Sequence, residues 1–185
     1  AARPQAKFLE LVHRLDRETS GILMLAKKRS ALVALHEQIR HGQIDKRYLA
    51  LVHGPWQHRR QHVKLPLFKY TTPEGERRVR VQSDGQPSHT IFNLLRKYGD
   101  FALLEAELKT GRTHQIRVHL KAIHHPIVCD ALYAPKGPCD LGLSRVGLHA
   151  WRIDVPRPDG ARTLVTAPLP EDFRRAAAAF GGDFA

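Results

Sequence analysis

Several features that would point to common protein functions are missing from this sequence of 185 residues. No apolar run is long enough to cross a bilayer, and no signal peptide stands at the start, so we expect a soluble, cytoplasmic protein that does not contact membranes. The glycine-rich loops that bind nucleotides, Gly-x-x-x-x-Gly-Lys-Ser/Thr and Gly-x-Gly-x-x-Gly, are absent, as is the Gly-x-Ser-x-Gly turn. Nothing in the sequence therefore predicts a cofactor.

Cysteine is also scarce. Cys129 and Cys139 are the only two, and their Cys-x9-Cys spacing fits neither a zinc knuckle nor a redox motif. We expect reduced thiols in a reducing compartment, with no functional role. Twelve histidines raise the question of a metal site, but no acid or cysteine stands beside them at ligand spacing, so none is predicted.

Acidic residues are few for a chain this rich in bases. Thirty Lys and Arg against 18 Asp and Glu give a formal charge of +12, which favours a polyanionic partner such as nucleic acid. The alternative is a basic protein without such a partner. The cations gather in blocks at 27–29, 59–60 and 77–80, and again between 109 and 121.

Hydrophobic periodicity predicts a single domain of mixed α/β (α+β) class, with a largely antiparallel sheet and flanking helices. Helices are expected over 31–41, with Ser30 as N-cap and Gly42 after its end, over 114–123, with Thr113 as N-cap, and from 170 onward. A short helix is expected over 4–10. Strands are expected at 21–26 (buried), 46–53, 77–82, 90–97, 101–109, 148–155 and 162–165, with an irregular stretch from 55 to 68.

One carboxylate stands out among the cations. Asp16 lies between Arg14 and Arg17 in the run His-Arg-Leu-Asp-Arg-Glu-Thr-Ser-Gly-Ile that starts at His13. A surface ion pair is the ordinary explanation of such a pattern. A carboxylate kept ionised by neighbouring cations can also serve as a nucleophile or as an electrostatic anchor.

Four blocks of sequence decide between these interpretations. The segment 13–21 resembles the signature of the RluA-type pseudouridine synthases, and 46–54 (Lys-Arg-Tyr-Leu-Ala-Leu-Val-His-Gly) resembles the tyrosine motif of that family. The segment 110–119 (Thr-Gly-Arg-Thr-His-Gln-Ile-Arg-Val-His) and the segment 147–150 (Gly-Leu-His-Ala) are similar to two further family motifs. All four stand in the family's order across most of the chain.

This resemblance implies an enzyme that isomerises uridines to pseudouridine in 23S (large-subunit) ribosomal RNA or its precursor, without cofactor or metal, as a monomer. It assigns the catalytic roles to three residues. Asp16 would be the nucleophile, Arg117 its salt-bridge partner, and Tyr48 the residue that stacks on the base or transfers its proton. Whether Asp16 attacks the ribose or removes the C2′ proton to give a glycal stays open.

The remaining site residues concern RNA binding. Arg14 would fill the gap left by the flipped uridine, Leu148 would pack against the base, and Arg112 and His114 would contact the substrate. Without the resemblance, Tyr48 would be interpreted as a core residue, and Arg117 as a contact to phosphate. One alternative is a non-catalytic RNA-binding or ribosome-assembly module on the same scaffold. Another is a nuclease, which would need paired carboxylates with a metal, or a histidine pair.

The domain organisation departs from the family in one respect. Members usually carry an S4 RNA-binding domain and a further catalytic-domain strand ahead of the aspartate motif, and neither is found in residues 1–185, which begin Ala-Ala-Arg-Pro without an initiator methionine. We expect these residues to be a catalytic domain that lacks this N-terminal segment.

Overall fold

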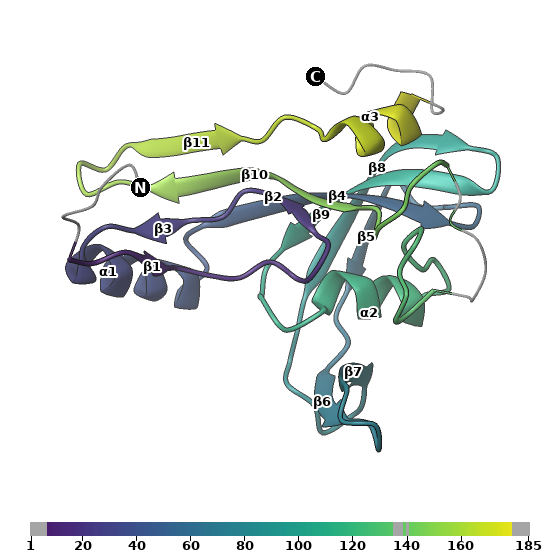
Figure 1. Ribbon diagram of the computed structural model, residues 1–185, viewed down its shortest axis with the longest axis horizontal. Coiled ribbons are helices and arrows are strands. Elements are labelled where there is room, and N and C mark those ends of the chain that lie inside the picture. The colour runs from purple at the N-terminus through teal and green to yellow at the C-terminus, as the bar shows by residue number, and fades with distance from the viewer. Residues whose placement is uncertain (1–6, 135–138, 140, 179–185) are drawn as a thin grey trace.

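The computed structural model describes residues 7–134, 139 and 141–178. A long, mostly antiparallel sheet forms its centre (Figure 1). The elements are β1 (Glu10–Leu11), β2 (Ser20–Gly21), β3 (Leu25–Ala26), α1 (Arg29–Arg40), β4 (Asp45–His53), β5 (Arg60–Val63), β6 (Leu67–Thr71), β7 (Arg77–Val81), β8 (Thr90–Tyr98), β9 (Phe101–Leu108), α2 (Gln115–Ala122), β10 (Leu148–Pro156), β11 (Arg162–Thr166) and α3 (Glu171–Ala178). The predicted mixed fold with a largely antiparallel sheet is confirmed.

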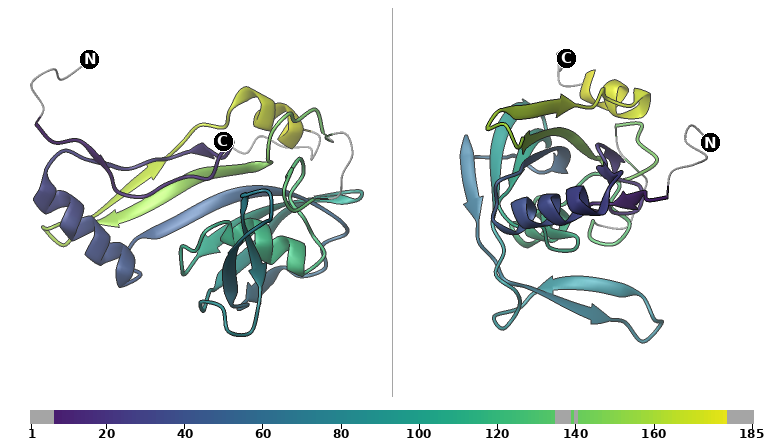
Figure 2. Two further views of the ribbon diagram at one scale, coloured as in Figure 1. Left: turned by 60° about the horizontal axis from the view of Figure 1, so that its bottom comes forward. Right: turned by 90° about the vertical axis from the view of Figure 1, so that its left-hand side faces the viewer.

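The main sheet has the strand order β11-β10-β4-β9-β8-β5, and β2 pairs with β10 in parallel. Its other pairings are antiparallel. Two small sheets are separate from it: β1 pairs with β3, and β6 with β7. The β6–β7 hairpin extends away from the main sheet (Figures 1 and 2).

Strand β4 divides the core because successive side chains of a strand point to opposite faces. Tyr48, Ala50 and Val52 belong to a cluster that includes Ile116 and Leu120 of α2. Leu49 and Leu51 belong instead to a cluster with residues of α3. Tyr48 therefore faces the side of the sheet where α2 lies. Lys46, two residues earlier in the strand, projects from the same side.

Gly21 fixes the close approach of β2 to β10. Its φ is +117°, and a Cβ built on it would lie 2.1 Å from the carbonyl oxygen of Ala150. No residue with a side chain fits there. Ile22 N donates to the same carbonyl oxygen at 2.9 Å. The glycine of the first motif thus lets the preceding loop dock on the sheet.

Most of the predicted elements are found with ends shifted by one or two residues, but several expectations fail. The run 21–26 is not one buried strand: β2 and β3 are two short strands, and Leu23 and Leu25 are 42% and 52% exposed. The stretch 55–68 is not irregular throughout, because it contains β5 and the start of β6. Their charged and histidine residues mask the strand alternation.

The N-caps predicted for α1 and α2 are also wrong. Helix α1 has Lys28 as its N-cap and α2 has His114, and neither N-cap makes a side-chain capping bond. His114 adopts a left-handed conformation, φ 53°, which no sequence pattern indicated. Gly42, with φ +66° and its N–H bonded to Ile39 O, follows α1 as expected. The predicted helix 4–10 lies partly outside the described residues, and its described part is not helical: β1 begins at Glu10.

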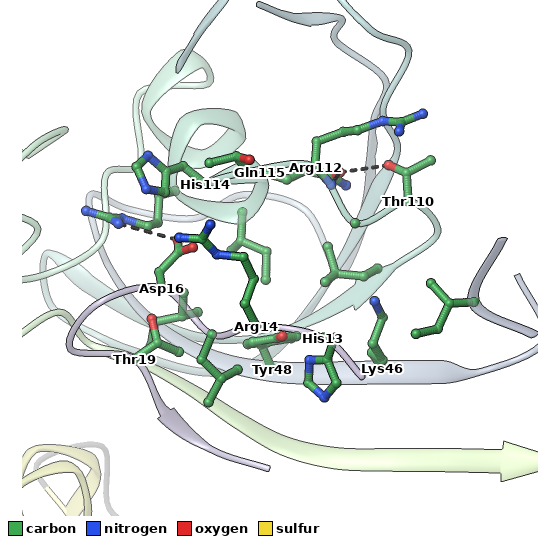
Figure 3. A pocket seen from close by; sticks show the side chains of 18 of the residues that line it. His13, Arg14, Asp16, Thr19, Lys46, Tyr48, Thr110, Arg112, His114 and Gln115 are labelled. Atoms are coloured by element: carbon green, nitrogen blue, oxygen red, sulfur yellow. Dashed lines mark hydrogen bonds and ion pairs between the residues drawn. The ribbon is translucent and has the colours of Figure 1, made fainter. Parts of the chain in front are cut away.

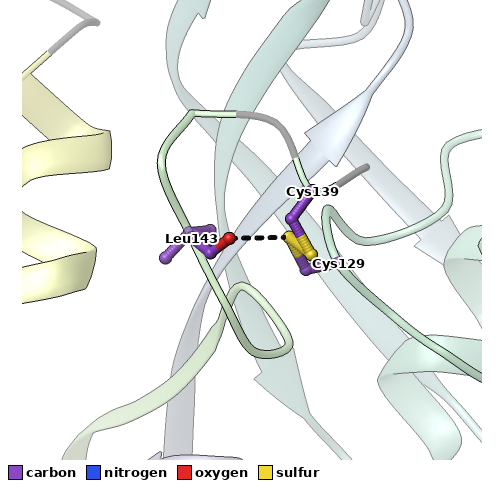
Figure 4. The surroundings of a disulfide bond; sticks show 3 residues. All are labelled: Cys129, Cys139 and Leu143. Carbon is purple, nitrogen blue, oxygen red and sulfur yellow. Dashed lines mark hydrogen bonds between the residues drawn. A yellow bond between two sulfur atoms is a disulfide. The ribbon is translucent and has the colours of Figure 1, made fainter. Parts of the chain in front are cut away.

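The cysteine prediction is corrected as well. Cys129 and Cys139 form a disulfide, with their Cα atoms 4.9 Å apart (Figure 4). The Sγ atom of Cys129 also lies 3.5 Å from the carbonyl oxygen of Leu143. Spacing in the sequence tests only for local motifs and does not show which residues the folded chain brings together. No helix of the described ranges is long and apolar enough to span a bilayer.

Candidate active site

A pocket of about 630 Å³ lies between the loop that follows β1, the C-terminal part of α1, strand β4 and the segment that leads into α2 (Figure 3). Every residue that the sequence singled out for the site lines this pocket. They are Arg14, Asp16, Tyr48, Arg112, His114, Arg117 and Leu148. The structure thus brings together residues separated by more than 130 positions in the chain.

Asp16 is held by the loop between β1 and β2. A turn closes it, with Thr19 N donating to Asp16 O at 3.0 Å. Beyond the turn, Ser20 Oγ lies 2.8 Å from Nδ1 of His149. Arg145 donates to Glu18 O at 3.0 Å. These contacts hold the loop at Glu18 and Ser20, close after Asp16, which fixes the position of the carboxylate.

Arg117 connects Asp16 to a second carboxylate. Its NH1 lies 3.4 Å from Asp16 Oδ2, while its Nε and NH2 donate to the two oxygens of Asp130 at 2.7 Å each. Among the described residues this is the only ion pair of Asp16; neither Arg14 nor Arg17 pairs with it. The Asp130 side chain is fully buried, and it raises the pKa of Arg117 against the opposing effect of burial, which is the larger single influence.

Tyr48 and Leu148 form the apolar wall of the pocket on neighbouring strands. Tyr48 is 9% and Leu148 is 3% exposed, and their strands β4 and β10 pair directly. Burial, and secondarily the charge of Asp16, raise the pKa of the Tyr48 phenol. Within the described ranges, no hydrogen bond engages its hydroxyl group. A protonated phenol therefore faces the pocket with its donor available.

His114 marks the start of α2 at the opposite rim from Tyr48 (Figure 3). Its Nδ1 lies 2.7 Å from the hydroxyl of Tyr133, which also accepts a bond from Val79 N at 3.1 Å. Burial is the main cause that lowers the pKa of His114, and burial raises the pKa of Tyr133 to about 12. The rim of the pocket is thus tied to the β6–β7 hairpin, since Val79 belongs to β7.

Arg14 and Arg112 present cations at the mouth. Both are exposed, and Arg14 makes no ion pair or hydrogen bond with a described residue. The side chain of Arg112 donates from Nε to Pro87 O at 3.2 Å, and its backbone N–H donates to Gln115 Oε1 at 3.0 Å. Gln115, which is 3% exposed, therefore shapes the segment that carries Arg112.

Three functional candidates escaped the sequence analysis: Asp130, Tyr133 and Lys46. Asp130 and Tyr133 follow a short apolar segment in a loop, and nothing local distinguishes a structural acid or phenol there. Lys46 lines the pocket but lies in a strand with many charges. The one signal in the sequence was its position two residues before Tyr48, which places both side chains on the same face of the strand.

Three of the histidines contact polar side chains of the protein rather than a cluster of possible metal ligands. His119 is fully buried between Thr90 Oγ1, 2.9 Å from Nδ1, and Ser88 Oγ, 2.8 Å from Nε2. His62 and His89 contact each other at 3.0 Å. In the part of the chain that the structure describes, no three His, Cys, Asp or Glu residues are grouped to hold a metal ion.

Comparison with known proteins agrees with the fold. The chain belongs to the RNA pseudouridylate synthase family, whose model matches residues 2–122.

Similar proteins include the ribosomal large subunit pseudouridine synthase C of Haemophilus ducreyi, 50% identical over 174 residues, and that of Escherichia coli strain K12, 45% identical over 182 residues. These alignments cover 91% and 95% of this chain but only 54% and 57% of the relatives, so the chain spans a little over half their length.

Solved structures show the same likeness. Human RNA pseudouridylate synthase domain containing 4 superposes with a TM-score of 0.79 at 26% identity, over 95% of this chain and 77% of that one. Human RNA pseudouridylate synthase domain containing 1 gives 0.76 at 28% identity, over 91% and 72%.

Proposed function

We propose that this chain isomerises uridine to pseudouridine in large-subunit (23S) ribosomal RNA and does so without a cofactor. Residues 1–185 would be the catalytic domain of the enzyme. The observation that carries the proposal is the arrangement of one carboxylate, Asp16, in a pocket walled by Tyr48 and Leu148 and paired with Arg117. The names of the bacterial relatives support the substrate class.

The reaction balances within the nucleotide. The bond from ribose C1′ to uracil N1 breaks, the base turns, and a bond from C1′ to C5 forms. The C5 proton leaves and N1 gains a proton, so no group and no electrons come from outside. A site for this reaction needs a group that acts at the sugar, a holder for the free base and a route for one proton.

Asp16 is proposed to act at the sugar. Its carboxylate either adds to C1′, so that the ribose is held while the base turns, or removes the C2′ proton to give a glycal. In both cases the negative charge must be available inside a pocket. Arg117 supplies the opposing charge, and Asp130 holds the guanidinium in a fixed orientation through two bonds.

Tyr48 and Leu148 are proposed to hold the detached base. The Tyr48 ring offers a stacking surface and its phenol a hydrogen-bond donor. Because its pKa is raised, the phenol is protonated before reaction. It can take the C5 proton only while it passes its own proton to an acceptor, which makes it part of a relay rather than a free phenolate base.

The RNA is proposed to reach the pocket by flipping out the uridine, which costs a few kcal/mol. Arg14, exposed beside Asp16, is the candidate to fill the gap, and Arg112 and His114 contact the substrate at the rim. We further propose that the protein works as a monomer in the cytoplasm, where mature or precursor ribosomal RNA is found.

The test is tritium release from large-subunit ribosomal RNA transcripts that carry 5-tritiated uridine. The 185-residue chain is expected to release tritium, and Asp16→Asn is expected to release none while it binds RNA as before. Asp159→Asn, in an exposed turn, is the matched control and should retain full activity. RNA binding by the unaltered chain without any release would favour the non-catalytic RNA-binding module instead.

A further inference from the structure

Lys46 is a cation in the pocket that the proposed reaction does not use. It lies on β4, two residues before Tyr48, and is half-buried. Among the described residues its ammonium group makes no ion pair and no hydrogen bond. Most lysines that lose water contact find a carboxylate, because an unpaired ammonium is costly to bury. The buried cation of the pocket follows that rule, because Arg117 pairs with Asp130.

The described residues that line the pocket leave no acid free to pair with Lys46. Asp16 is the single acidic residue among the described residues that line the pocket, and it pairs with Arg117. Lys46 lies at the end of the pocket away from Asp16, with Tyr48 and Arg14 between them (Figure 3). Burial lowers the pKa of Lys46, and its charge contributes to lowering the pKa of His13. The structure thus leaves a positive charge without an anion.

The ammonium lies against the segment that leads into α2. A Cβ built on Gly111 would be 3.2 Å from Lys46 Nζ. Gly111 therefore leaves room for the lysine. The next residue, Arg112, is a second cation of the pocket lining, but its side chain points away from Lys46 (Figure 3). A pocket whose charged lining residues are mostly cations, one of them without a counter-charge among the described residues, attracts an anion.

We propose that Lys46 binds a phosphate group of the RNA strand next to the uridine that Asp16 and Tyr48 hold. This inference rests on the proposed function. Side chains two apart on a strand are separated by about 6–7 Å, roughly one sugar unit, so a base against Tyr48 would place its neighbouring phosphate near Lys46. The phosphate would supply the negative charge that Lys46 lacks in the protein itself.

The test is the salt dependence of RNA binding. The probe is a large-subunit ribosomal RNA transcript in which the unaltered chain forms pseudouridine, and binding is measured in the Asp16→Asn background so that no turnover interferes. Lys46→Gln is expected to lower the slope of log K against log salt by about 0.7, the value for one lost phosphate contact on a single strand. Lys46→Arg keeps the charge and should keep the slope.

The matched control is Lys97→Gln. Lys97 is exposed near the end of β8, and the pairings of β9 place it at the opposite end of the sheet from Lys46. It should leave the slope unchanged. Thermal unfolding checks that each variant folds; should Lys46→Gln not fold, Lys46→Met, which keeps most of the aliphatic chain, takes its place. A second readout is the pKa of Lys46 by NMR, which a bound phosphate should raise.

An unchanged slope in the lysine variant would overturn the proposal, even if turnover fell, because Lys46 would then contact a neutral group such as a base carbonyl. The outcome is separable from the proposed function. Pseudouridine formation by the unaltered chain with an unchanged slope removes only the phosphate site. No pseudouridine formation by the unaltered chain removes the proposed function itself.

Discussion

Arg117 is bound more tightly by Asp130 than by Asp16. Both oxygens of Asp130 accept bonds at 2.7 Å, while Asp16 is reached by one NH group at 3.4 Å. The buried acid therefore holds the guanidinium, and the guanidinium faces the pocket carboxylate with its remaining NH group. This division lets Arg117 stay in place while the environment of Asp16 changes during a reaction.

Replacing Asp130 should damage both stability and activity. Asp130→Asn leaves Arg117 buried without its main counter-charge, and we expect the free energy of unfolding to fall by about 3 kcal/mol. Urea unfolding measures this. Tritium release should fall as well, because Arg117 is free to turn fully toward Asp16. Asp84→Asn, on an exposed turn, should change neither quantity, and equal stability of the Asp130 variant would show that the pair contributes little.

Removing the hydroxyl of Tyr48 should affect the reaction and not the fold. No described group bonds to this hydroxyl, so Tyr48→Phe should alter the free energy of unfolding by less than about 0.5 kcal/mol. Single-turnover pseudouridine formation should slow by about 10²-fold or more if the phenol takes part in proton transfer. RNA affinity serves as the control. A variant with normal turnover would reduce Tyr48 to a stacking surface.

The approach of β2 to β10 makes Gly21 irreplaceable. Gly21→Ala adds the strain of a positive φ, about 1–3 kcal/mol, to a collision with the Ala150 carbonyl group. Gly160→Ala is the matched control, since φ there is +81° and nothing lies within 4 Å of the added carbon. Thermal unfolding should show a clearly larger loss for Gly21→Ala, together with lost activity. Equal losses of stability in the two variants would mean that the strain of the positive φ, and not the collision with Ala150, causes the effect.

Acid should destabilise the protein through buried histidine. Burial lowers the pKa of His119 below the value of 6.5 that it has when unfolded. The unfolded chain then binds the proton more readily, so stability is full above about pH 6.5 and is lost as the pH falls below it. Unfolding midpoints between pH 7.5 and 5 test this. His119→Gln should flatten the profile relative to the exposed control His58→Gln, and an unaltered profile would assign the acid sensitivity to other groups.

The sequence carried much of the fold because its signals are local. The strand-like runs 90–97 and 101–109 and the turn between them predict a hairpin wherever it lies, and the helical spacing in 31–41 does the same for α1. Where charges interrupt the alternation, as in β5, or where the apolar run 21–26 bends around a glycine, local patterns gave the wrong element. His114 caps α2, and its side chain contacts Tyr133, 19 residues further along the chain, which no local pattern contains.

The motifs of the sequence alone determined the family and the set of residues that meet at the pocket, since those residues stand in short blocks with a fixed order. Only the tertiary structure decided which charges face each other. An ion pair depends on distance and on the exclusion of water, and both follow from packing. Within the part of the chain that the structure describes, the arginines beside Asp16 in the sequence do not pair with it, whereas Arg117 does. Asp130 holds Arg117, and the ammonium of Lys46 has no counter-charge among the same residues.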